Sequence, residues 1–101
     1  MLRTSETMHG SEARIRYRAL LAAAMRRLAA APTGYSTVDR SELSVGVRSY
    51  HIRHSRHESR EDPVRKPVHV IFYRTLSPEL IEIVRVLHER AEPSLHFGLG
   101  P

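Results

Sequence analysis

Five side chains in the last third of the sequence could together move protons or hold phosphate charge. They are one tyrosine, three arginines and one histidine: Tyr73, Arg74, Arg85, His88 and Arg90. RNA can be cleaved by its own 2′-hydroxyl when a protein supplies a base, an acid and cations for the phosphate in the transition state. Tyr73, Arg74, Arg85 and His88 are therefore the candidate catalytic residues of a metal-independent endoribonuclease.

The same side chains also have a purely structural interpretation, and we favour it. In that interpretation Tyr73 packs in the core, and His88 caps the end of a strand. Arg74 and Arg85 lie on adjacent strands and pair with carboxylates, such as that of Glu82 or those of a partner. Side-chain type without geometry is weak evidence for catalysis, so the sequence favours a protein that is not an enzyme without excluding one.

A run of histidines at three-residue spacing, His51, His54 and His57, raises the question of a metal site. In a strand, residues three apart point to opposite faces, so His51 and His54 cannot easily share one ion. No second group of ligand residues accompanies them. We therefore expect solvent-facing histidines, with no metal and no cofactor.

The composition excludes several classes of protein. The chain has 101 residues and no cysteine, which rules out disulfides, thiolate nucleophiles, cysteine zinc sites and iron–sulfur clusters. Its longest run of small apolar residues, 20–25, is far shorter than the roughly 20 residues that span a membrane. The first ten residues lack the apolar region of a signal peptide, so we expect a single cytoplasmic domain.

The charge balance points to an anionic partner. There are 16 basic and 11 acidic side chains, a net charge of +5, and fifteen of the basic residues are arginine. Guanidinium groups match carboxylates and phosphates, so this surplus fits an acidic protein or a nucleic acid, although codon bias in a GC-rich genome would produce it too. We do not expect direct nucleic-acid binding, because no DNA-binding motif accompanies the arginines.

One long helix is predicted in the first third of the chain. Apolar residues recur at three- and four-residue steps over 11–31, with Ser11 as the expected N-cap. Pro32 and Gly34 end the pattern. The predicted connection that follows is polar and has no sustained period.

Three strands are predicted after that connection, over 47–55, 67–75 and 80–88, with a charged turn at 56–66. Short connections favour an antiparallel meander with one face packed on the helix. The expected fold class is therefore α+β, one long helix on a three-stranded antiparallel sheet. The predicted core residues are Leu20, Leu28, Ile71, Ile83 and Leu87.

Three segments in this order carry a resemblance to a known family. They are 9–17 with the leucines after it, 47–56, and the pair 70–74 and 81–90. Together they resemble the ParE/RelE toxin family of bacterial type II toxin–antitoxin systems, in its ParE-like branch. The first is similar to the family's second helix, the next to its first meander strand, and the last pair to its final hairpin.

The resemblance covers about residues 4–92. It implies a single RelE/ParE-like domain over 1–101 that is short at its N-terminus, without the family's first strand and most of its first helix. Residues 93–101 are expected to form a flexible tail. A sheet that lacks one strand has an unpaired edge, so dependence on a partner or homo-oligomerisation is expected.

The resemblance also implies a function. ParE-like toxins bind DNA gyrase and trap its cleaved DNA complex, which arrests growth, and they are neutralised by an acidic antitoxin that wraps around them. Such systems serve plasmid stabilisation. The implied partner-binding residues, on the final hairpin, are Arg74, Arg85, His88 and Arg90. Two alternatives stay open, a RelE-like ribosome-dependent mRNA endoribonuclease and a degenerate inactive copy.

Overall fold

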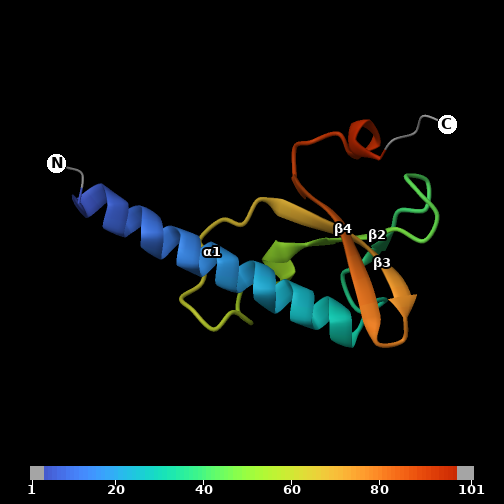
Figure 1. Ribbon diagram of the computed structural model, residues 1–101, viewed down its shortest axis with the longest axis horizontal. Helices are drawn as coiled ribbons and strands as arrows, with labels where there is room; N and C mark the ends of the chain where they lie inside the picture. Colours follow the sequence, from blue (N-terminus) through green and yellow to red (C-terminus); the bar gives the residue numbers. More distant parts are fainter. Residues whose placement is uncertain (1–3, 98–101) are drawn as a thin grey trace.

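A computed structural model describes residues 4–97 and shows one long helix lying across a small sheet (Figure 1). In chain order its elements are α1 (Thr4–Ala30), β1 (Val38–Asp39), β2 (Arg48–His51), η1 (Ile52–Ser55), β3 (His69–Ser77), β4 (Leu80–His88) and η2 (Pro93–His96). The strands pair antiparallel in the order β1-β2-β3-β4. The α+β class is therefore confirmed, and the described sheet has four strands instead of the predicted three.

Helix α1 is longer than predicted at its start. The predicted N-cap at Ser11 is wrong, because the helix runs through Gly10 and Ser11 without a break. A single glycine costs a helix only about 1 kcal/mol, which does not stop a helix already stabilised on both sides. The predicted end is correct within one residue, since Pro32 prevents its continuation beyond Ala30. The 27 residues make a rod of about 40 Å whose N-terminal half projects beyond the sheet (Figure 1).

The main core lies between α1 and one face of the sheet. Leu20, Leu28 and Ile71 are fully buried there, as predicted. Tyr73 is buried in the same cluster, as the structural interpretation predicted, together with Ala24, Tyr50 and Ile52, which were not among the predicted core residues. The prediction that Ile83 and Leu87 are core residues is wrong, because both are only partly buried. They lie on β4, which ends the sheet and has no neighbouring strand within the described residues to cover it.

Strand β2 is shorter than predicted because the chain turns into η1 after His51. The His51 ring caps that turn, accepting the Arg53 backbone N–H at Nδ1 over 3.1 Å. The hydroxyls of Tyr50 and Ser55 form a buried hydrogen bond of 2.7 Å that holds it. The predicted strand at 67–75 is displaced by two residues, to His69–Ser77, and the strand at 80–88 has the predicted bounds.

The opposite face of the sheet, which we call the open face, carries a second and smaller core. Leu43 and Val47, from the loop that precedes β2, are buried in it together with Phe72 of β3. Gly46 in this loop has φ of 79°, a left-handed conformation that favours glycine, and turns the chain into β2. Within the C-terminal segment, Pro93–His96 form η2, and the Phe97 ring meets the Phe72 ring edge-on at 5.4 Å. Residues 98–101 of the predicted tail lie outside the described residues.

Candidate functional site

Tyr73 lies in the core and not at a surface. Its side chain is fully buried, and its hydroxyl donates a hydrogen bond to the carbonyl oxygen of Pro32, at the end of α1. Burial raises the pKa of the Tyr73 phenol above its ordinary value. A buried phenol that already donates its proton to the backbone ties the sheet to the helix and has no route to a substrate.

Arg74 is part of a cross-strand ion pair on the open face. It lies opposite Glu82 in the β3–β4 ladder, and its Nε donates to the Glu82 Oε1 over 3.4 Å. Both side chains are more than one third exposed, so the pair contributes at most about 1 kcal/mol to stability. The structural interpretation of Arg74 as a partner of Glu82 is confirmed.

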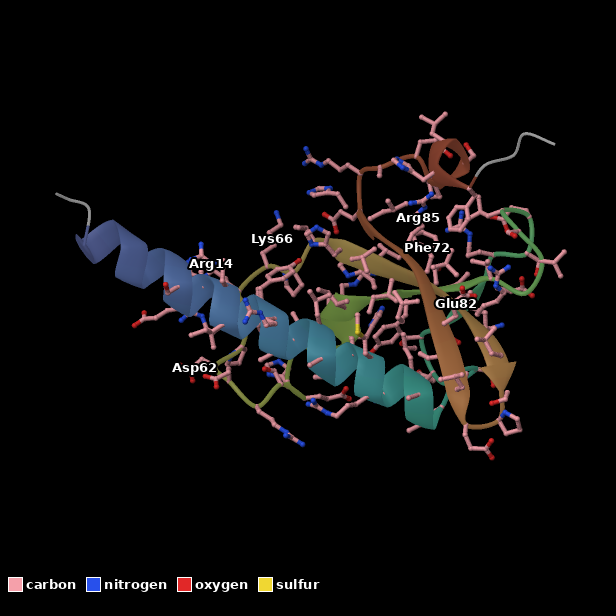
Figure 2. The ribbon with its side chains drawn as sticks, viewed as in Figure 1. Arg14, Asp62, Lys66, Phe72, Glu82 and Arg85 are labelled. Carbon is pink, nitrogen blue, oxygen red and sulfur yellow. The ribbon has the colours of Figure 1, made fainter. Side chains whose placement is uncertain are left out.

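Arg85 lies opposite Phe72, and its Nε donates to the His96 carbonyl oxygen over 2.8 Å. Figure 2 shows Arg85 between β4 and the η2 segment, above Phe72. Arg74 and Arg85 line one shallow hollow of about 430 Å³, together with Ser44, Val84, His96 and Phe97. The structure therefore brings these two predicted residues to the same place on the open face.

The chemistry of this hollow is cationic. A ribonuclease that works without metal needs both a base and an acid beside its cations. Among the described residues, the lining of this hollow supplies one imidazole, that of His96, and no carboxylate. No pattern in the sequence marks His96, which the turn of η2 brings to this hollow. The arrangement suits binding of carboxylates more directly than proton transfer.

His88 and Arg90 lie elsewhere, at the far end of β4. The His88 Nδ1 accepts the backbone N–H of Arg90 over 3.0 Å, so His88 caps the end of its strand as the structural interpretation predicted. Its ring also meets the His69 ring edge-on at 5.8 Å. The four predicted partner-binding residues thus form two groups, Arg74 with Arg85 and His88 with Arg90.

His88 borders a second groove of about 370 Å³ on the open face. The groove has Val70, Phe72 and Leu87 among its apolar lining, and Arg40, His51, Arg53 and His54 among its basic lining. The His51 Nε2 lies 2.7 Å from the Glu89 Oε1, and this hydrogen bond is the main reason that the Glu89 pKa is lowered.

Arg40 was not found by sequence reasoning. Its guanidinium lies 5.7 Å from the centre of the Phe72 ring, and its Nε donates to Glu42 over 2.8 Å. It sits in the irregular connection before β2, where no periodic pattern marks a residue as part of a site. Only its contact with a ring 32 positions away reveals it.

The three spaced histidines make separate contacts. His51 pairs with Glu89, the His54 ring lies 5.7 Å from the Tyr50 ring, and the His57 Nε2 lies 3.2 Å from the Arg56 Nη1. Burial is the main cause that lowers the pKa of His54. Within residues 4–97 no group of three or more potential ligands is placed to hold a metal ion. No helix in this range is long and apolar enough to cross a membrane.

Similarity to a known protein family covers most of the chain. A family model described as the ParE toxin of the type II toxin–antitoxin system, parDE, matches residues 3–93. No curated protein sequence and no solved structure matches significantly. The match extends from α1 to the start of η2 and includes both groups of predicted partner-binding residues.

Proposed function

This chain belongs to the ParE toxin family of type II toxin–antitoxin systems, and we propose that it acts as a toxin that inhibits DNA gyrase by protein contact. We further propose that a cognate acidic antitoxin neutralises it. Because gyrase acts on chromosomal DNA, the proposed place of action is the bacterial cytoplasm. The proposed genetic role is plasmid stabilisation by growth arrest of cells that lose the antitoxin.

The observation that carries this proposal is that the four candidate catalytic residues of the ribonuclease hypothesis do not converge on one acid–base pair. Tyr73 is buried, and His88 lies in the other of the two groups, away from the hollow lined by Arg74 and Arg85. An inhibitor that acts by contact needs no such pair. It needs exposed groups that recognise a partner, and arginines beside a shallow hollow provide them.

Charge supports the antitoxin as an acidic partner. The chain carries a net charge of +5, and 11 acidic side chains leave several arginines without a carboxylate. Opposite potentials accelerate encounter and fix the orientation of two partners. The proposed contact residues are Arg74, Arg85, His88 and Arg90.

The test is inducible expression in bacteria with and without the adjacent antitoxin gene, together with a supercoiling assay on purified gyrase. We expect growth arrest, induction of the DNA-damage response and accumulation of cleaved DNA, with messenger RNA intact. Arg85→Ala should weaken these effects, whereas the matched change Arg60→Ala, in the exposed charged turn, should not.

Two outcomes would contradict the proposal. Cleavage of ribosome-bound messenger RNA, lost in Arg85→Ala, would assign the chain to the ribonuclease branch. Normal growth after expression of folded protein would identify an inactive copy.

A further inference from the structure

Strand β4 presents a long apolar edge to solvent. It has nine residues and is the last strand of the sheet, so its outer backbone groups have no strand partner within residues 4–97. Leu80 and Val86 are 56% and 38% exposed, and Ile81 and Ile83 are only partly buried. An unpaired edge of this length is a template for another strand.

A bulge in the middle of β4 changes which of its residues share a face. Phe72 pairs with Arg85 and Tyr73 pairs with Ile83, so Val84 is an extra residue in the strand. Alternation along β4 is therefore shifted by one position at Val84. As a result Glu82 and Arg85 lie on the same, open face, because they stand opposite Arg74 and Phe72.

The same shift brings apolar residues into matching positions. Ile81 and Val86 stand opposite Thr75 and Ile71, which share the face that packs on α1. Leu80 and Leu87 each lie one step along the strand from this pair, and so both lie on the open face. The second half of β4, read backwards, therefore matches the first half in residue character: leucine with leucine, isoleucine with valine, and glutamate with arginine.

We propose that two copies of the chain pair antiparallel through their β4 edges, about a two-fold axis between Ile83 and Val84. In this register Glu82 of each copy lies opposite Arg85 of the other, and Ile81 lies opposite Val86. Leu80 lies opposite Leu87, so each of these three pairs occurs twice and the two sheets become continuous. The pairing shares Arg85 with the proposed partner contacts, but it can be measured on the isolated chain without gyrase or antitoxin.

The proposed register pairs opposite charges on the same face, which a shift of one residue does not. A shift of one residue places Glu82 opposite the second copy's Val86. Residues that are paired across the two strands would then point to opposite faces of the sheet. Both charged residues keep capacity for a new partner, since the Glu82 side chain is 46% exposed and Arg85 is exposed. The negative charge of Glu82 offsets the positive charge of Arg85 within the edge, so the net charge of +5 does not make two β4 edges repel each other.

Sedimentation of the full chain over a wide range of concentrations tests this pairing. We expect a reversible dimer. Glu82→Arg and Arg85→Glu each create two like-charge pairs and should weaken dimerisation by about tenfold. The double variant Glu82→Arg/Arg85→Glu restores both attractive pairs and should restore the dimer. The matched control Glu79→Arg changes a charge in the exposed turn before β4 and should have no effect.

A second measurement uses the absence of cysteine from the chain. Chains carrying Glu82→Cys and chains carrying Arg85→Cys should form a disulfide dimer when mixed and oxidised, and much less when oxidised separately. Circular dichroism establishes that each variant is folded. A chain that is monomeric at all concentrations would overturn the proposal. A dimer that neither charge reversal weakens, or cysteine variants that cross-link equally well alone, would overturn it as well.

Discussion

The Tyr17 Oη lies 2.5 Å from the His69 Nδ1, which joins the middle of α1 to the first residue of β3 across 52 positions of sequence. The same phenol oxygen accepts the backbone N–H of Val68 over 3.1 Å, and the two rings meet edge-on. Tyr17 therefore satisfies two groups at the start of β3.

Tyr17→Phe should destabilise the fold by about 1 to 3 kcal/mol, because it leaves the Val68 N–H and the His69 ring nitrogen without this partner. Urea denaturation followed by circular dichroism measures the change. The control Tyr35→Phe removes a hydroxyl from a side chain that is 86% exposed and should leave stability unchanged. Equal stability of the two variants would show that the Tyr17 hydroxyl is replaced by water without cost.

Stability should fall as the pH is lowered from about 7 to about 5. Burial is the first cause that lowers the pKa of His69, followed by the charge of His88, and burial likewise lowers the pKa of His54. In that pH range the unfolded chain binds protons at these histidines that the native chain does not, which favours unfolding. Thermal melts of the native chain and of His69→Gln measure the effect.

The pH slope should be shallower in His69→Gln than in the native chain. The control His57→Gln changes an exposed histidine and should keep the native slope. A native chain whose melting temperature rises between pH 7 and pH 5 would contradict the sign of this argument.

Leu28→Ala should cost about 3 kcal/mol, because Leu28 is fully buried between α1 and the sheet. Ile83→Ala should cost about 1 kcal/mol, since its side chain is only partly buried on β4 and part of its surface is already hydrated. Chemical denaturation of both variants measures this difference. Strand pairing through the β4 edge leaves the two faces of the sheet uncovered, so the difference is expected for monomer and dimer alike. Equal losses would show that the Ile83 side chain is covered in solution as completely as that of Leu28.

The sequence predicts correctly those element boundaries that depend on neighbouring residues alone. The bounds of β4 follow from its run of β-branched residues, and the end of α1 follows from Pro32. Strand β1 has two residues and exists only because Val38 and Asp39 pair with β2. No local pattern predicts such a strand.

The candidate site was predictable to a similar degree. Arg74 and Arg85 were expected on adjacent strands, and the β3–β4 register places them around one hollow. His96 and Arg40 were missed because the turn of η2 and the loop before β2 bring them to the open face. The bulge at Val84, which decides the face of Arg85, is likewise a property of strand pairing.

Association with an acidic antitoxin should slow as salt is added, because the net charge of +5 steers the encounter. Surface plasmon resonance at increasing ionic strength should show a falling association rate and a nearly constant dissociation rate. Arg74→Ala and Arg85→Ala should raise the dissociation rate, since these residues are proposed to contact the partner directly. Arg60→Ala removes the same charge from the exposed turn and should lower only the association rate. An association rate independent of salt would show that charge does not select the partner, and identical kinetics for Arg85→Ala and Arg60→Ala would remove the hollow from the contact surface.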